Sequence, residues 1–379
     1  AGRHDVVRRA EARRRVDRGT MSLGTIRVHD LVRGARARGA TDLHFGGADR
    51  PALRVDGRLV VVDTQPVDEA DARAFLASAL SEEQFARLDA RGTADGGAAR
   101  DTDGGPYRVH AYRHAGGVRV AIRLLAERIP TLEQLGLPAV VATFAQRPAG
   151  LVLFTGPTGS GKTTALAALV DRINRSTERN VVTVEDPVEY VHVPARSFVT
   201  HCEIGRDVRD YAEALRGLLR ADPDVIVVGE MRDRATIAAA LTAAETGHLV
   251  FATLHTNDAA QTVDRIVDAF AADAHAQIRS QLASVLAGIV ALRLIPRLDG
   301  AGRRAAAEIL VGTDAVRALI REGKTHQLRN TIVTGRAAGM QTLETHLSEL
   351  VVRGEIALAD AHAATSRPGE IRAFERSAS

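Results

Sequence analysis

The chain of 379 residues is poor in several residue types, and each shortage excludes a class of protein or site. A single cysteine, Cys202, can form neither an internal disulfide nor a zinc site built from several cysteines. Tryptophan is absent and aromatic residues make up only 3%, so the stacking platforms that bind single-stranded nucleic acid are not expected. No apolar run approaches the roughly 20 residues that a membrane-spanning helix needs.

The N-terminal region is basic but carries no apolar segment of the signal-peptide kind, which predicts a cytoplasmic protein. Arginines crowd residues 8–18, and we interpret residues 1–21 as a solvated tail, with Met21 as a candidate natural start. A basic helix lying on a membrane surface is the alternative. The net charge of +3 is small for this length, and we expect no nucleic-acid partner.

The apolar pattern predicts an α/β fold with a mostly parallel sheet. Buried strands are expected at 151–155, 181–185, 225–229 and 248–255, with helices between them, notably at 207–220 and 234–245. A smaller preceding domain has hairpins at 53–62, about Asp56 and Gly57, and at 107–124, with helices at 68–80 and 81–90. Beyond Pro296 the strand signals stop, and helices are predicted at 313–322, 325–334, 341–353 and 358–365.

These patterns divide the chain into six segments. They are the tail 1–21, a small α/β domain at 22–128, a linker with proline and glycine at 129–138, the domain with the parallel sheet at 139–296, a helical region at 297–366, and a disordered tail at 367–379.

A glycine-rich loop follows the first buried strand of the parallel sheet and opens into a helix. Its residues are Gly156, Pro157, Thr158, Gly159, Ser160, Gly161, Lys162 and Thr163, with Thr164 next. This arrangement is a P-loop, which binds a nucleoside triphosphate such as ATP. Glycines let backbone N–H groups turn toward phosphate oxygens, while Lys162 reaches the phosphates and Thr163 offers its hydroxyl to Mg²⁺. Lysine occurs elsewhere only at Lys324, so one of two lysines stands where a compact charge suits a phosphate.

Two further buried strands end in carboxylates. Glu230 follows one of them, where a base could orient the attacking water, and Gly229 stands where an aspartate is usual. Glu185, Asp186 and Glu189 end the other strand or follow it. Parallel strands end at one edge of a sheet, so we expect these groups to face the same nucleotide. The predicted Mg²⁺ ligands, some acting through water, are Thr163, Glu185, Asp186 and Glu230.

Two histidines flank the strand predicted at 248–255. The odd spacing of His248 and His255 points their side chains to opposite faces, so a metal ion shared between them is not expected. His255, at the strand end, is the better candidate for a sensor of the γ-phosphate, and an ordinary hydrogen-bonded histidine is the alternative.

Together these segments resemble the secretion ATPases of type IV pilus and type II secretion systems, over nearly the whole chain after residue 22. Residues 39–44 resemble the opening of the family's PAS-like N-terminal domain, 185–189 its Asp box, 222–233 its Walker B region and 244–257 its His box. A glycine before the Walker B glutamate, here Gly229, is usual in this family.

The resemblance implies a PAS-like N-terminal domain, a RecA-like P-loop domain, and a homohexamer that hydrolyses ATP with Mg²⁺. Glu230 or Glu185 would orient the water, and His255 would report the γ-phosphate to the moving domain. The motor would act at the cytoplasmic face of the inner membrane on a platform protein of the pilus machine. The family's arginine fingers correspond to Arg108 and Arg123, with Arg216, Arg220 and Arg232 as further candidates.

Residues 315–322 are similar to the C-terminal helix motif of the family members that retract type IV pili for twitching motility. Ala318 departs from the asparagine that is usual there, while Val316, Leu319 and Ile320 form an apolar helical stripe. Extension and secretion motors usually carry a four-cysteine metal loop, which this chain cannot form. We therefore predict a retraction motor. The alternatives are a pilus extension or type II secretion ATPase of the same family, a RecA-like nucleic-acid translocase, and a nucleotide-binding regulator without hydrolysis.

Overall fold

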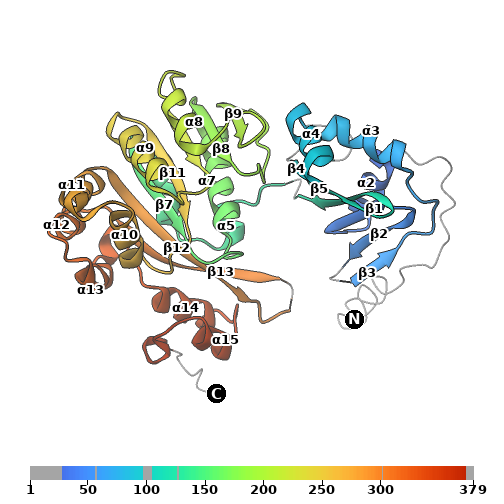
Figure 1. Ribbon diagram of the computed structural model, residues 1–379. Helices are drawn as coiled ribbons and strands as arrows, with labels where there is room; N and C mark the ends of the chain where they lie inside the picture. The colour runs from blue at the N-terminus through green and yellow to red at the C-terminus, as the bar shows by residue number, and fades with distance from the viewer. Residues whose placement is uncertain (1–27, 56–57, 97–104, 126–127, 301, 373–379) are drawn as a thin grey trace, which may run out of the picture. The chain divides into compact units, whose positions relative to one another are not determined.

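The computed structural model describes residues 28–55, 58–96, 105–125, 128–300 and 302–372 (Figure 1). They form two compact units, divided after Leu125, each with its own sheet and hydrophobic core. The predicted turn at Asp56 and Gly57 and the predicted tail 1–21 lie outside the described residues.

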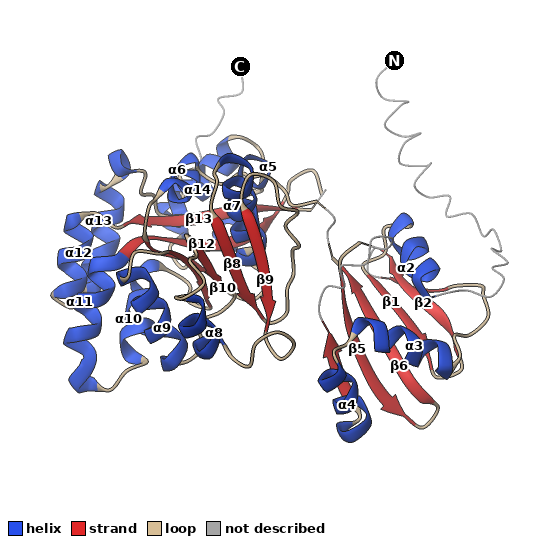
Figure 2. Ribbon diagram, turned by 90° about the horizontal axis from the view of Figure 1, so that it is seen from above, coloured by secondary structure: helices blue, strands red, loops and turns tan. Residues whose placement is uncertain are grey.

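The first unit is an antiparallel sheet with helices against one face (Figure 2). The strand order is β3 (Arg58–Val61), β2 (Asp49–Val55), β1 (Asp42–Gly46), β6 (Gly117–Leu124), β5 (Tyr107–His114) and β4 (Thr93–Gly96). The helices are α2 (Val28–Ala37), α3 (Glu69–Ala79) and α4 (Glu82–Arg91). In β6, Val118, Val120 and Ile122 are buried in the core that includes Phe75 of α3. Buried and less buried residues alternate along β6, as expected for a sheet with one face covered by helices. The antiparallel pairs β2–β3 and β5–β6 confirm the two predicted hairpins, and α3 and α4 confirm the two predicted helices.

The second unit is built on a seven-stranded sheet in which every neighbouring pair except one is parallel. Its order is β13 (Arg303–Val311), β12 (Leu286–Pro296), β7 (Gly150–Thr155), β11 (Leu249–Leu254), β10 (Val225–Val228), β8 (Asn180–Glu185) and β9 (Phe198–Glu203). Helices cover both faces: α7 (Lys162–Ser176) lies on one, and α8 (Tyr211–Leu218), α9 (Arg234–Glu245) and α10 (Ala259–Asp268) on the other (Figure 2). All residues of β7 and β11 are buried, which explains their unbroken apolar sequences.

Strands also occur where the sequence did not predict them, at β9, β12 and β13. The expectation that strands stop at Pro296 is wrong, because β13 pairs antiparallel with β12 from Arg303 to Val311. The run Ala305–Ala306–Ala307 favours a helix by intrinsic propensity. Pairing with β12 and burial in the core override that preference.

The remaining α-helices of the second unit are α5 (Leu132–Leu135), α6 (Ala139–Thr143), α11 (His275–Val285), α12 (Asp314–Arg321), α13 (Leu328–Thr334), α14 (Leu343–Val352) and α15 (Leu358–Ala363). The last four confirm the four helices predicted beyond Pro296. In α12, Val316 and Ile320 are fully buried and Leu319 is half-buried, as the apolar stripe predicted. No helix in the described part of the chain has the length and apolar character to cross a membrane.

The prediction of a disordered tail from residue 367 is wrong for its first six residues. Pro368–Glu370 form a 3₁₀ turn, Glu370 pairs with Arg329, and Ile371 joins a small core with Leu347 and Leu350. The chain therefore stays packed against α13 and α14 up to the end of the described residues.

One buried carboxyl links β13 to the start of α10. Glu308 Oε1 accepts a hydrogen bond of 2.8 Å from the backbone N–H of Ala259. Burial raises the pKa of Glu308 to about 7; the charges of Asp258 and Glu344 also raise it, while the bond from Ala259 and the charge of Arg329 lower it. The folded protein therefore holds a proton here at pH values where the unfolded chain has lost it. The resulting stability is present below the ordinary pKa of 4.5 and is lost as the pH rises through about 7.

Replacing Glu308 by glutamine should remove this pH dependence, since the amide keeps an acceptor oxygen and cannot ionise. We expect Glu308→Gln to melt at the same temperature as the wild type at pH 4 and at a higher temperature at pH 8. The pKa shift corresponds to about 3 kcal/mol of unfolding free energy at most. Calorimetry across this pH range measures the difference, with Glu178→Gln on the surface as the control. A melting difference that is equal at both pH values would contradict the assignment.

Candidate active site

The loop between β7 and α7 has the backbone shape of a phosphate cradle. Gly156, Gly159 and Gly161 have φ angles of 139°, 77° and 93°, in the region that side chains rarely adopt. A Cβ on Gly156 would lie 2.4 Å from the carbonyl oxygen of Leu292. The loop can therefore take this path only with glycine at these places, which leaves its backbone open to a ligand.

Lys162 lies inside this loop. Its Nζ donates to the carbonyl oxygens of Gly156 and Pro157, at 2.8 and 3.0 Å. Burial lowers the pKa of Lys162, and the charges of Glu230 and Glu189 oppose that effect, so both carboxylates lie near the ammonium. The buried hydroxyl of Ser160 has no hydrogen-bond partner among the described residues, and a phosphate oxygen would supply one. These features fit a nucleotide phosphate.

The end of β10 packs closely against the end of β8. The Gly229 N–H donates to the Val184 carbonyl oxygen at 2.7 Å. A Cβ on Gly229 would lie 3.0 to 3.2 Å from the Tyr211 hydroxyl, the Glu185 Cα and the Val184 oxygen. Two of these three atoms belong to the backbone, so they cannot give way easily. This crowding explains why glycine stands where an aspartate is usual.

Glu230 is held from two sides just beyond this glycine. Its Oε2 pairs with Nη2 of Arg232 at 2.8 Å, and its Oε1 with Nε2 of His255 at 3.0 Å. Burial by itself raises the pKa of Glu230, but the hydrogen bonds and charges of Arg232 and His255 outweigh it and lower the pKa below its ordinary value. Glu230 is therefore ionised at neutral pH, and the predicted sensor His255 is bonded directly to it.

The other predicted carboxylates gather at the same edge, around a side chain that the sequence did not single out. Burial raises the pKa of the Tyr211 phenol, and the charges of Asp186, Glu185 and Glu230 raise it further. Tyr211 is the first residue of α8, after its N-cap Asp210, and nothing in the sequence distinguished it from other helix-starting residues. The prediction that both strand ends meet at one edge is confirmed by the parallel pairing of β8 and β10.

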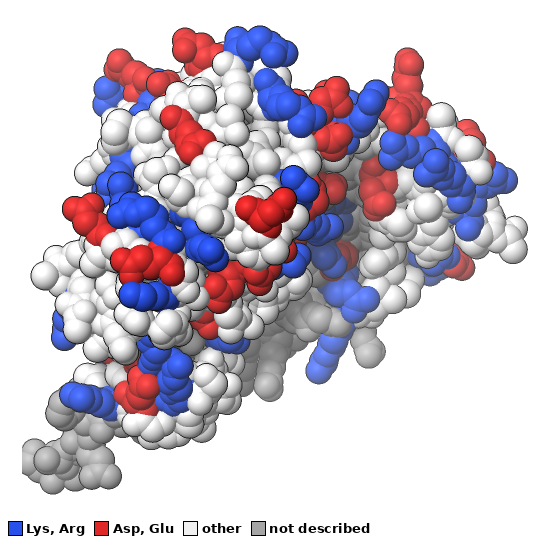
Figure 3. All heavy atoms as spheres, turned by 60° about the vertical axis from the view of Figure 1, so that its left-hand side comes forward, with Lys and Arg blue, Asp and Glu red and all other residues white. Residues whose placement is uncertain are grey.

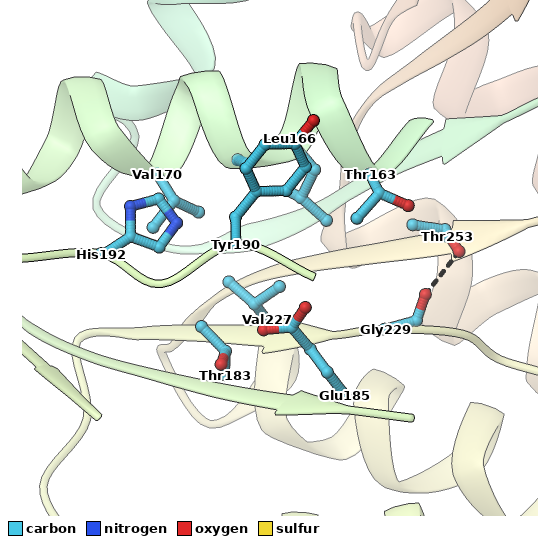
Figure 4. Close-up of a pocket in the computed structure, with 11 residues that line it drawn as sticks. Thr163, Leu166, Val170, Thr183, Glu185, Tyr190, His192, Val227, Gly229 and Thr253 are labelled. Carbon is cyan, nitrogen blue, oxygen red and sulfur yellow. Dashed lines mark hydrogen bonds between the residues drawn. The ribbon is translucent and has the colours of Figure 1, made fainter. Parts of the chain in front are cut away.

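A cavity of about 30 Å³ lies between α7 and the strands, beside these carboxylates (Figure 4). It is lined by Thr163 of the P-loop, Glu185, and two residues that the sequence analysis missed, Tyr190 and His192. The Tyr190 hydroxyl lies 2.9 Å from the hydroxyl of Thr164. The segment after Glu189 therefore closes the space beneath the start of α7.

The predicted Mg²⁺ ligands come from different elements. Within the described residues, no group of three or more histidine, cysteine, aspartate or glutamate side chains is arranged to hold a metal ion. Mg²⁺ at nucleotide sites takes few protein ligands and keeps water and phosphate oxygens instead. The hydroxyl and carboxylates of Thr163, Glu185, Asp186 and Glu230 suit that kind of shared coordination.

The remaining candidates are His248 and five arginines. His248 is at the opposite end of β11 from His255, and its Nδ1 contacts the Ala243 carbonyl oxygen at 2.9 Å. Arg108 and Arg123 are paired across β5 and β6 in the first unit, where Arg123 binds Asp42 at 2.9 Å. The predicted finger roles of Arg108, Arg123, Arg216 and Arg220 stay predictions, and Arg232 contacts Glu230.

The parallel sheet, the P-loop and the carboxylates at neighbouring strand ends define a P-loop nucleoside triphosphatase. The sequence matches the family of type II/IV secretion system proteins over residues 25–375. The chain belongs to this family.

Two relatives and one solved structure show where within the family the similarity is high. The chain is 42% identical over 330 residues to the type IV pilus retraction ATPase PilT of Pseudomonas aeruginosa, covering 87% of this chain and 95% of that protein. It is 47% identical over 251 residues to a twitching motility protein of Neisseria gonorrhoeae, covering 66% and 67%. A crystal structure of the pilus retraction motor PilT with bound ADP has a TM-score of 0.82 at 39% identity, covering 91% of this chain and 98% of that one.

Adding one methyl group at Gly229 should disturb the whole site. Because a Cβ there would crowd the Tyr211 hydroxyl and two backbone atoms of β8, Gly229→Ala should destabilise the protein by about 1–3 kcal/mol and lower nucleotide hydrolysis. Gly217→Ala is the matched control, since a Cβ there meets nothing within 4 Å and the residue lies inside α8. The control should be as stable as the wild type or more so. Thermal melts and phosphate release measure both; equal behaviour of the two variants would refute the steric argument.

Proposed function

We propose that this chain is an ATPase of the type IV pilus machine, a homohexameric motor that uses ATP and Mg²⁺ to retract the pilus. The observation that carries the proposal is the meeting of the P-loop, Glu185 and the Glu230–His255 pair at one edge of the sheet. The similarity to the P. aeruginosa retraction ATPase extends over 95% of that protein, so the proposal covers the whole motor and not the nucleotide site alone.

The position of each site residue determines its proposed role. Gly156, Gly159 and Gly161 shape the phosphate cradle, Lys162 neutralises phosphate charge, and Thr163 offers its hydroxyl to Mg²⁺. Glu230 or Glu185 orients the attacking water, with Asp186 beside them. His255 couples any movement of Glu230 to the loop that begins α10, because it binds Glu230 and precedes that helix.

Retraction is favoured by the C-terminal part of the chain. The segment that resembles the retraction motors forms α12, whose Val316 and Ile320 anchor it in the core of the second unit. Charges of both signs are interspersed on the face that Figure 3 shows, without a continuous basic stripe of the kind that tracks nucleic acid. We place the motor at the cytoplasmic face of the inner membrane, where it acts on a platform protein and where Arg108 and Arg123 serve as arginine fingers.

Removing the charge of the catalytic carboxylate should stop hydrolysis while binding persists. We expect Glu230→Gln to lower kcat about 100-fold or more and to bind a fluorescent ADP analogue as the wild type does. Glu185→Gln shows whether the second carboxylate is equally necessary, and Glu213→Gln on the exposed side of α8 is the control. Full-rate hydrolysis by Glu230→Gln would remove Glu230 from the mechanism, and DNA-stimulated turnover of the wild type would favour a nucleic-acid translocase.

The biological role is tested in the native host. A strain that lacks this gene should carry many surface pili and show no twitching, and the wild-type gene, but not Lys162→Ala, should restore movement. Electron microscopy counts the pili. Bald cells would indicate an extension or assembly motor, and an unchanged pilus count with normal twitching would contradict the pilus assignment.

A further inference from the structure

Tyr190 connects two parts of the site through its side chain. Its hydroxyl lies 2.9 Å from the hydroxyl of Thr164, so the two groups share one hydrogen bond that either of them can donate. Thr164 is the third residue of α7, directly after Lys162 and Thr163. The first N–H groups of a helix have no partner within it and are available to bind phosphate. Tyr190 is therefore bonded to the turn of α7 that meets the nucleotide.

The Tyr190 ring is held by packing as well as by this bond. It lines the cavity of about 30 Å³ together with Leu166 of α7 and Glu185 at the end of β8. Figure 4 shows the ring between α7 and the strand end that carries Glu185. These contacts do not involve the hydroxyl, so a phenylalanine at this position would keep them.

Glu189 lies between two anchored residues of the acidic segment, which we define as residues 185–190. On one side, Val188 is buried and its backbone N–H donates to Glu203 Oε2 at 3.3 Å. On the other side is Tyr190, held by its bond to α7. Glu189 is also one of the two carboxylates close to the ammonium of Lys162. The anchors on both sides therefore fix where this carboxylate stands relative to the P-loop.

The other anchors of this part of the chain lead to the edge strand β9. Glu203, which accepts the bond from Val188, is the last residue of that strand. His201 of the same strand accepts a bond of 3.1 Å from the backbone N–H of His192. The Tyr190 hydroxyl leads instead to α7 and thus to the P-loop. This bond determines how the acidic segment lies against the P-loop, whereas the other two determine how it lies on the sheet.

We propose that Tyr190 is a positioning residue for ATP hydrolysis: its hydroxyl ties the acidic segment to the first turn of α7, so that Glu185 and Glu189 face the phosphates in the P-loop. A movement of this turn when the nucleotide binds then carries the carboxylates with it. Two neutral hydroxyls form the tether, so it holds the segment without adding charge near the nucleotide. This inference rests on the proposed hydrolysis of ATP.

One substitution removes the tether and little else. In the full chain, Tyr190→Phe keeps the ring and deletes only the hydroxyl. We expect its kcat to fall about 5- to 50-fold, because displaced carboxylates no longer meet the reacting groups, and its KM for ATP to stay within about 2-fold of the wild type. Tyr112→Phe on β5 of the first unit is the matched control and should leave both constants unchanged.

A double-mutant cycle assigns the loss of activity to the bond with Thr164. Thr164→Val removes the other hydroxyl and keeps a side chain of similar shape. If both substitutions break the same bond, the double variant Tyr190→Phe/Thr164→Val should be no slower than the slower single variant. A double variant whose kcat falls by the product of the two single effects would overturn the tether.

Hydrogen exchange supplies a measurement that does not depend on turnover. In Tyr190→Phe, amides of residues 186–192 should exchange about 10-fold faster than in the wild type, because local opening no longer has to break the bond, while those of β10 stay unchanged. Wild-type kcat in Tyr190→Phe would overturn the proposal, and so would slow turnover with unaltered exchange. A wild type that does not hydrolyse ATP would overturn the proposed function instead, and the exchange rates would still decide whether the tether exists.

Discussion

The site depends on the close approach of β8 and β10 at Gly229. Because the backbone of Gly229 bonds to Val184 and leaves no room for a side chain, the two strands end side by side. Their carboxylates, Glu185 and Glu230, then reach the same space in front of the P-loop. The same contact disfavours an acidic side chain at position 229.

Much of this arrangement could be predicted from the sequence, because it depends on local patterns. The P-loop and the carboxylates at strand ends follow from buried apolar runs and the rule that parallel strands end together. The partners of those carboxylates could not be predicted. His201 lies 3.6 Å from Glu185 on a strand that was not expected, and Tyr211, whose pKa these carboxylates raise, stands at the start of a helix. Both positions depend on register and packing. β13 was missed since its alanines favour a helix and only pairing with β12 makes it a strand.

The edge of the sheet that carries the P-loop and Glu230 is joined to the C-terminal part of the chain by hydrogen bonds around one loop. The loop after β11 carries His255, and Asn257 within it accepts a bond of 3.2 Å from Arg293 of β12. Glu308 of β13 binds the first N–H of α10, which follows the same loop. Any shift of His255 against Glu230 therefore acts on β12 and β13 through polar groups that are already bonded. This is a physical connection between hydrolysis and the helices packed on that side of the sheet.

The position of β13 at the edge of the sheet also determines how the chain can be divided. β12 is an interior strand, with β7 on one side and β13 on the other. A protein cut after Pro296 would expose the unpaired backbone of a long apolar strand, which is a template for aggregation. The region after Pro296 is thus not a module that can be exchanged as a whole, because it includes an edge strand of the ATPase sheet. Chimeras that swap the C-terminal helices need their junction before Leu286 or after Val311.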